Sequence, residues 1–207
     1  MLSLDARMAA VAVTQEGVFT RAQALDVGFS GAQIHRRTRL GVWERLLPRV
    51  YRHASTPNSR AGAHWAAVLW AGPGCALSHA SAAAIWRMAI SAPAAPELSV
   101  PNTRGPRTRG VTVHRVTRID DQDIVRIGRL PVTEPVRTIV DLAAVLDAHD
   151  LEVLVVSARA RGLVTVRALR GRLDEIGTAG RPGAARIRML LDAFGSGPAP
   201  SSARMAG

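Results

Sequence analysis

The stretch from Gly28 to Arg52 constrains the fold of this chain more than any other segment. A glycine turn is followed by a basic helix pattern and then by two short strand-like pieces. Ser30 precedes Gln33 by three residues, which is the S-x-x-Q form of a capping box and predicts a helix start near Ser30. Gly41 stands where a glycine typically ends a helix. This order predicts a winged helix-turn-helix, whose second helix lies in the major groove of DNA.

Two further helices precede this stretch. Residues 4–16 place apolar side chains at helical spacing, and Gly17 ends the pattern. Thr20 then precedes Gln23 by three residues, which predicts a second capping box and a second helix. We therefore expect a complete winged helix-turn-helix domain within residues 1–56.

The predicted helix from Ser30 to Leu40 carries most of the candidates for DNA contact. A run of charges is usually a solvated helix face, and that alternative applies here. Its position as the third helix, after a glycine turn and before a hairpin, favours DNA reading instead. Trp43 and Tyr51 are expected to pack the hairpin onto the helices rather than to stack on bases. The candidate DNA-binding residues are Arg21, Gln23, Ser30, Gln33, His35, Arg36, Arg37, Arg39 and Arg49.

The charge of the chain supports this interpretation. The 207 residues carry a formal net charge of +11, and all 27 basic residues are arginine. Residues 1–60 hold nine arginines against four acids. A basic surface attracts polyanions, and the arginine fork matches both phosphate and guanine edges. The alternative is an arginine-rich surface that has no partner.

Enzyme chemistry is not indicated. We find no phosphate-cradling loop, no metal-ligand spacing and no triad, so no catalytic residue, metal or cofactor is expected. Cys75 is a single cysteine and is expected to be a buried thiol. Ser78 and His79 are adjacent, and neighbouring side chains rarely point at one another. We therefore expect Ser78 to cap a helix and His79 to be a buried, hydrogen-bonded residue.

The remainder of the chain predicts a second, mixed α/β domain over residues 61–194, so the whole chain is expected to be α+β. A loop at 57–60 would separate the two domains, and a Gly/Ser/Pro-rich tail at 195–207 is expected to be disordered. Arg137 and Asp141 are expected to pair on one helix face. The basic loop at 101–110 fits either a phosphate-tracking segment or a surface tip. Strands are expected at 75–77, 96–100, 111–116, 124–127 and 130–132, and helices at 61–71, 78–86, 134–143, 147–160, 165–176 and 182–194.

The location of the protein follows from what the sequence lacks. The N-terminus has no basic segment followed by an apolar run, so no signal peptide is predicted. No apolar stretch reaches the length that crosses a bilayer. A cytoplasmic protein without a membrane partner is expected.

Several segments together resemble a known family. The first group is Gly17-Val-Phe-Thr20-Arg-Ala-Gln23-Ala-Leu25, Gly28-Phe-Ser30 and Trp43-Glu-Arg-Leu-Leu-Pro48-Arg-Val50-Tyr51. The second is Leu77-Ser78-His79-Ala-Ser81-Ala-Ala83, Leu130-Pro131-Val132-Thr133 and Arg137-Thr138-Ile139-Val140-Asp141-Leu142-Ala143. The third is Arg161-Gly162-Leu163-Val164 and Gly180-Arg181-Pro182-Gly183. Over nearly the whole length to Phe194, the chain resembles the AbiEi-type antitoxins and DNA-binding proteins common in actinobacteria.

The resemblance implies a winged helix-turn-helix joined to an AbiEi-like C-terminal domain. Such antitoxins of type IV toxin–antitoxin pairs bind inverted repeats in their own promoter, repress it, and counter a nucleotidyltransferase toxin. Some longer relatives add an endonuclease domain of the very-short-patch-repair type. No acidic cluster follows Phe194, so the metal-binding carboxylates of such a nuclease are absent from this chain. Met88-Ala-Ile90 also departs from the glycine that relatives tend to have after Trp86.

The sequence thus favours a DNA-binding transcriptional regulator. Two alternatives stay open: a protein-interaction module, and a non-catalytic remnant of a nuclease whose catalytic domain was lost in a truncated gene product. The operator, the toxin partner and the oligomeric state are also open.

Overall fold

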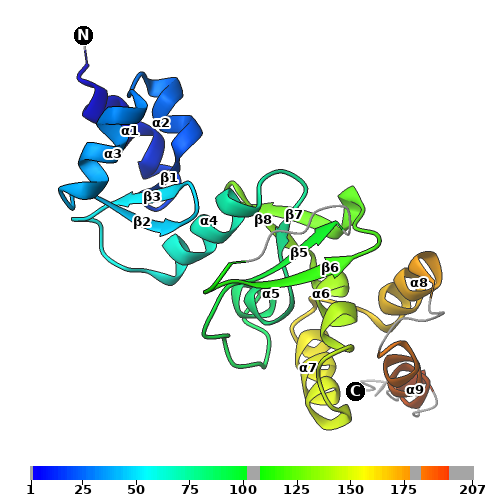
Figure 1. The fold of residues 1–207 in the computed structure, drawn as a ribbon. Helices are drawn as coiled ribbons and strands as arrows, with labels where there is room; N and C mark the ends of the chain where they lie inside the picture. Colours follow the sequence, from blue (N-terminus) through cyan, green and yellow to red (C-terminus); the bar gives the residue numbers. More distant parts are fainter. Residues whose placement is uncertain (1, 102–107, 178–182, 196–207) are drawn as a thin grey trace, which may run out of the picture. The chain divides into compact units, whose positions relative to one another are not determined.

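The computed structural model describes residues 2–101, 108–177 and 183–195 of the chain (Figure 1). The chain divides into two compact units. The first contains Met1–Ala82 and Ala92–Thr133, and the second contains Ala83–Ser91 and Glu134–Gly207. The fold is a mixed α+β structure, as expected. None of the described helices combines the length and the apolar character that crossing a bilayer requires.

The first unit begins with three helices and an antiparallel three-stranded sheet. The sheet has the order β1-β3-β2. Strands β2 and β3 form a hairpin, and β1, the short strand before α2, pairs with β3. The N-terminal helix ends at Val13, earlier than residue 16, because Thr14 to Gly17 turn towards β1. The elements are α1 (Leu4–Val13), β1 (Val18–Thr20), α2 (Arg21–Val27), α3 (Gly31–Arg39), β2 (Trp43–Leu47) and β3 (Val50–His53).

Both predicted capping boxes are confirmed. Thr20 caps α2 with Gln23, and Ser30 caps α3 with Gln33, each through reciprocal side-chain and backbone bonds. Between the helices, Gly28 has a φ of 114°, a conformation that favours glycine. The tight turn at this position therefore has the residue type that its backbone requires.

One aromatic cluster holds the three helices on the sheet. The Trp43 ring packs edge-on against Phe19 and Phe29, with centroids 4.7 Å and 5.0 Å away. Tyr51 stacks on Phe19 at 6.2 Å. Trp43 is only 2% exposed, so the expectation that Trp43 and Tyr51 pack within the fold is confirmed.

The helix α4 (Arg60–Ala71) packs on the three-stranded sheet through Ala66, which joins a buried cluster with Val18 and Val50. The same helix also contacts β4, β5 and β8 of a second sheet. The predicted break at 57–60 therefore does not divide the two compact units, because α4 ties both sheets into the first unit.

The second sheet has the order β6-β5-β4-β8-β7. Strand β5 runs parallel to β6, and β4 runs parallel to β8, while the other neighbours are antiparallel. The expected strands are present with shifts of one residue at some ends. The elements of this region are β4 (Ala76–Leu77), α5 (His79–Ile85), β5 (Glu97–Pro101), β6 (Thr112–Val116), the 3-10 turn η1 (Asp121–Asp123), β7 (Ile124–Ile127) and β8 (Leu130–Thr133).

The second unit is built from four helices. They enclose an apolar core to which α7 contributes Leu151, Leu154, Val155 and Ala158, the inward face predicted from sequence. Glu134 is the N-cap of the first of these helices. The helices are α6 (Pro135–Leu142), α7 (Ala148–Ala160), α8 (Val166–Ile176) and α9 (Ala184–Gly195). The predicted disordered tail and most of the predicted loop at 101–110 lie outside the described residues.

Candidate nucleic-acid interface

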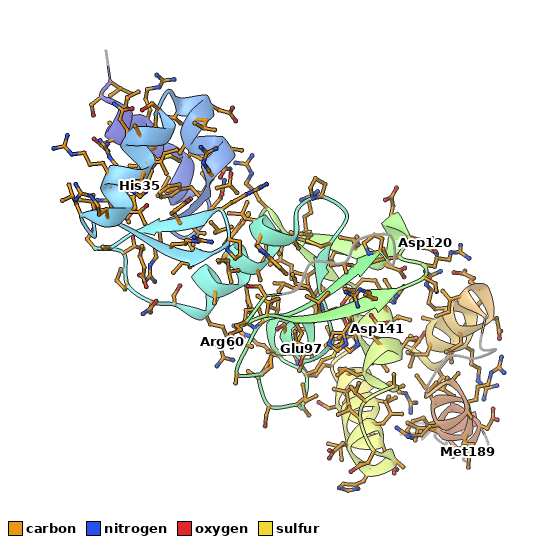
Figure 2. All side chains as sticks on the ribbon, viewed as in Figure 1. His35, Arg60, Glu97, Asp120, Asp141 and Met189 are labelled. Atoms are coloured by element: carbon orange, nitrogen blue, oxygen red, sulfur yellow. The ribbon has the colours of Figure 1, made fainter. Side chains whose placement is uncertain are left out.

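The helix α3 turns one polar face towards solvent. Ile34 is 3% exposed and anchors the opposite face in the aromatic cluster. His35, Arg36 and Arg39 are exposed on the outer side of the helix, and Figure 2 labels His35 there. The two arginines make no ion pair with any residue that the structure describes. The face is thus cationic and open to a partner.

The capping residues make the hydrogen bonds predicted for them. The Ser30 Oγ accepts the Gln33 N–H at 3.2 Å, and the Gln33 Oε1 accepts the Ser30 N–H at 2.8 Å. Gln23 and Thr20 exchange the same pair of bonds at 2.8 Å and 3.1 Å. Ser30 therefore fixes the start of α3, while Gln33, which is exposed, retains its amide nitrogen for an outside acceptor.

Arg37 is half-buried and contacts other residues of the fold, although it belongs to the predicted contact set. Its guanidinium forms an ion pair with Asp5 of α1, with Nη2 and Oδ2 3.0 Å apart. The same group lies over the Phe29 ring at 4.5 Å and near the Trp43 ring at 5.6 Å. These contacts fasten α3 to α1 and to the aromatic cluster, so we assign Arg37 a packing role.

Arg21 and Arg49 come together at the start of α2. The Arg21 N–H donates to the Arg49 carbonyl oxygen at 2.8 Å, which ties the β2–β3 turn to this helix. Both side chains are exposed. The Arg21 guanidinium also lies close to the start of α3. Its Nη2 atom is 3.1 Å from the position that a Cβ at Gly31 would occupy. The structure therefore places the Arg21 cation at the start of α3, with Arg49 joined to Arg21 through the backbone.

Ion pairs within the first unit neutralise some of the acidic residues of this region. Asp5 pairs with Arg37, and Glu44 pairs with the buried Arg52 at 2.5 Å. Half of the four acids in residues 1–60 are thereby neutralised by arginines that are not on the open face. Arg45, exposed on β2, is a candidate that the sequence analysis missed, and the signal for it was an arginine in the hairpin that follows the basic helix.

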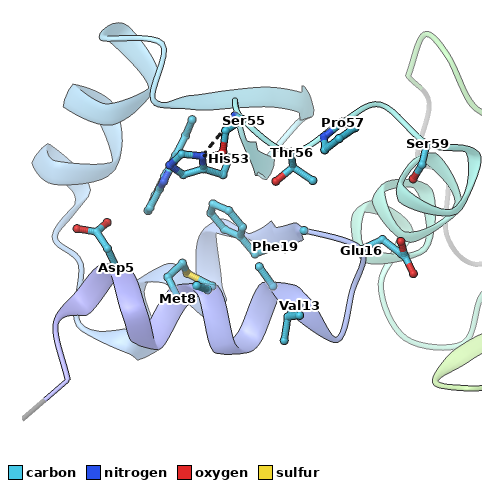
Figure 3. A pocket seen from close by; sticks show the side chains of 14 residues that line it. Asp5, Met8, Val13, Glu16, Phe19, His53, Ser55, Thr56, Pro57 and Ser59 are labelled. Carbon is cyan, nitrogen blue, oxygen red and sulfur yellow. Dashed lines mark hydrogen bonds between the residues drawn. The ribbon is translucent and has the colours of Figure 1, made fainter.

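A cleft marks a different side of the same region. It has a volume of about 680 Å³ and lies between α1 and the segment after β3 (Figure 3). Met8, Ala12 and Phe19 give it an apolar floor, while Asp5 and Glu16 contribute carboxylates. Carboxylates beside apolar side chains do not suit phosphate, so this cleft is a poorer candidate for a nucleic-acid interface than the α3 face.

The structure also gathers three residues that the sequence analysis did not connect. His79 at the start of α5, Glu97 of β5 and His114 of β6 each offer a ligand atom, and these atoms lie within 4.8 Å of one another. They are separated by 18 and 17 positions, so no short spacing signals the group.

The neighbouring pair of Ser78 and His79 corrects one expectation. The Ser78 Oγ lies 2.9 Å from the His79 Nδ1, so these adjacent side chains do contact each other. The prediction that His79 is buried and hydrogen-bonded is confirmed. Ser78 has no exposed surface, and a buried hydroxyl is not open to a substrate.

Comparison with known proteins shows the fold alone. No known family and no curated protein matches the sequence. Among solved structures, the crystal structure of the RV2827C protein from Mycobacterium tuberculosis is similar, with a TM-score of 0.60 and 18% sequence identity. The similarity covers 94% of this chain and 78% of that one. The arrangement of elements described above is therefore shared with a solved protein over nearly all of the chain.

Proposed function

We propose that the chain is a DNA-binding regulator in which α1 to β3 form a winged helix-turn-helix, with α3 as the helix that enters the major groove. The observation that carries the proposal is the exposed cationic face of α3, with Arg21 at the start of this helix. Helices that enter the major groove read base edges from such a face, while arginines beside it hold phosphates.

In this proposal Gln33, His35 and Arg36 contact base edges or phosphates, and Arg21, Arg39, Arg45 and Arg49 contact the backbone. From the resemblance to AbiEi-type antitoxins, we further propose that the protein represses its own promoter and counters a nucleotidyltransferase toxin. Binding to the DNA upstream of its own gene, compared with a scrambled duplex at two salt concentrations, tests the regulator directly.

The charge-removing variant Arg36→Ala with Arg39→Ala tests the assigned face. We expect an affinity loss of about tenfold or more and a shallower dependence of log K on log salt, by close to one for each phosphate contact removed. Fluorescence anisotropy with a labelled duplex at several salt concentrations measures both quantities.

Two matched variants separate the interface from general charge. Arg167→Ala removes a charge from an exposed site on α8 and is expected to leave the affinity nearly unchanged. Arg37→Ala is expected to lower the free energy of unfolding, because Arg37 pairs with Asp5. Its effect on the free energy of DNA binding is expected to be smaller. Equal losses for Arg167→Ala and for the α3 variant would show that the charge acts without a defined face.

A further inference from the structure

The residues His79, Glu97 and His114 form a compact cluster on one face of the second sheet. Strands β5 and β6 are parallel with Ser99 opposite His114, so Glu97, two residues before Ser99, is a diagonal neighbour of His114 on that face. His79 reaches the same face from the end of β4, where the Ser78 N–H donates to the Glu97 carbonyl oxygen at 3.0 Å. Figure 2 labels Glu97 at this place.

The distance between His114 and Glu97 is long for a hydrogen bond. The His114 Nε2 lies 3.4 Å from the Glu97 Oε2, and this buried nitrogen has no hydrogen-bond partner among the described residues. Two ligands of a tetrahedral zinc ion, each about 2.1 Å from the metal, are about 3.4 Å apart. The spacing therefore matches that of two ligands on one ion.

The surroundings hold two of the three candidate ligands in place. The Ser78 Oγ contacts the His79 Nδ1 at 2.9 Å, and an imidazole that donates from Nδ1 presents the lone pair of Nε2 to a metal. The Glu97 Oε2 accepts the Ala80 N–H at 3.2 Å, and the Glu97 N–H donates to the Ser81 Oγ at 2.9 Å. Bonds of this kind orient the ligands in metal sites.

The backbone at one of the candidate ligands is strained. The backbone of His79 has a φ of 49°, in the left-handed region that non-glycine residues rarely adopt. Strained backbone of this kind gathers at functional sites.

We propose that His79, Glu97 and His114 bind a divalent transition-metal ion, with zinc as the best match, and leave a fourth position for water or a ligand. Two nitrogen donors and one carboxylate oxygen are a ligand set that zinc accepts in sites with an open position. The proposal is independent of DNA binding by α3.

The two rings must move when the ion binds. They are stacked with centroids 3.5 Å apart and planes 13° from parallel, and ring lone pairs lie in the ring planes, so the two rings cannot both direct a lone pair at one point. A shared ion requires one ring to turn out of the stack. His114 has the room to do so, because its side chain is 24% exposed and β6 is the edge strand of the sheet.

The experiment uses the full chain after treatment with a chelator. Calorimetric titration with Zn²⁺ is expected to give one ion per chain, and Co²⁺ is expected to give the strong visible absorption of a tetrahedral site. His114→Ala and Glu97→Gln should each weaken Zn²⁺ binding by about 100-fold or more, while Ser78→Ala should weaken it by about 10- to 100-fold. Circular dichroism verifies that each variant is folded.

The control is His149→Ala, which removes an exposed histidine from α7 and should bind Zn²⁺ as the natural chain does. The absence of one-to-one binding in the natural chain overturns the proposal. So does equal binding by the natural chain and His114→Ala, because the ion would then sit on other histidines.

Discussion

At the scale of single residues, Arg49 combines a cation with a strained backbone. Its φ is 64° in the turn between β2 and β3, although the side chain is exposed. A glycine at this position is free of that strain, and the left-handed conformation costs other residues about 1–2 kcal/mol. An arginine retained there is consistent with a contact made by its side chain.

We therefore expect Arg49→Gly to raise the free energy of unfolding by about 1 kcal/mol while it lowers DNA affinity. Urea unfolding and anisotropy measure the two effects. Arg49→Ala is the matched control, and it should lose the same affinity without gaining stability. If Arg49→Gly binds DNA as well as the natural chain does, Arg49 makes no contact with the backbone of DNA.

His64 gives the fold a dependence on pH. It is 6% exposed on α4, and burial, followed by the nearby charge of Arg60, lowers its pKa below the ordinary 6.5. The unfolded chain therefore takes up a proton near pH 6.5, while the folded chain resists it until lower pH. The stability contributed by neutral His64 is present above pH 6.5 and is lost as the pH falls through the folded value.

In urea unfolding at pH 7.5 and 5.5, the natural chain should be less stable at the lower pH. His64→Gln cannot take up that proton, so its stability should fall less between the two values. His149→Gln, altered at an exposed site, should follow the natural chain. Parallel losses in the natural chain and His64→Gln would contradict the assignment.

At the scale of elements, the features set by local chemistry were predicted from the sequence. The capping boxes at Thr20 and Ser30 depend on residues three positions apart, and both formed as expected. The Arg137–Asp141 pair spans one helical turn and is also confirmed, at 2.9 Å. In each case the partner is specified by helix geometry alone.

Features set by pairing between distant strands were not predicted. His114 reaches Glu97 only because β6 lies parallel to β5 in one particular register, which no local pattern in the sequence reveals. The contact of Arg37 with Asp5 was not foreseen because the two residues are 32 positions apart in sequence. The contact of Ser78 with His79 was missed because the left-handed backbone at His79 breaks the usual alternation of side chains.

The buried ion pair of α6 allows a prediction about this element. Arg137 has no exposed surface and Asp141 is 5% exposed. Arg137→Ala should lower the free energy of unfolding by about 3–5 kcal/mol, because it leaves a buried carboxylate without this partner. The double variant Arg137→Met with Asp141→Leu should cost less than either single change, as measured by urea unfolding. A double variant that costs the sum of the two single changes would show that the pair does not interact.

At the scale of the whole molecule, the boundary of the proposed DNA-binding part is set by α4. The sequence analysis ended this domain at residue 56, where the composition changes. In the structure, Val18 and Val50 of the three-stranded sheet are buried by Ala66 of α4. The sheet therefore has apolar contacts on both faces, and α4 supplies those of one face.

A fragment of residues 1–72 should consequently show a cooperative thermal transition, whereas a fragment of residues 1–56 should not, because its sheet exposes Val18 and Val50. Circular dichroism melts of the two fragments test this expectation. A cooperative transition of equal midpoint for the shorter fragment would show that α4 is dispensable for this part.

The capping box of α3 also limits which base Gln33 can recognise. Glutamine reads adenine by accepting a hydrogen bond from N6 and donating one to N7. The Gln33 Oε1 is already turned towards the Ser30 N–H, 2.8 Å away, which points the amide nitrogen outwards. In the proposed groove-bound helix, the amide nitrogen of Gln33 therefore donates to acceptor atoms such as the N7 of adenine or guanine, the guanine O6 or the thymine O4. The two hydrogen bonds that start α3 thus disfavour the two-bond contact by which a glutamine singles out adenine.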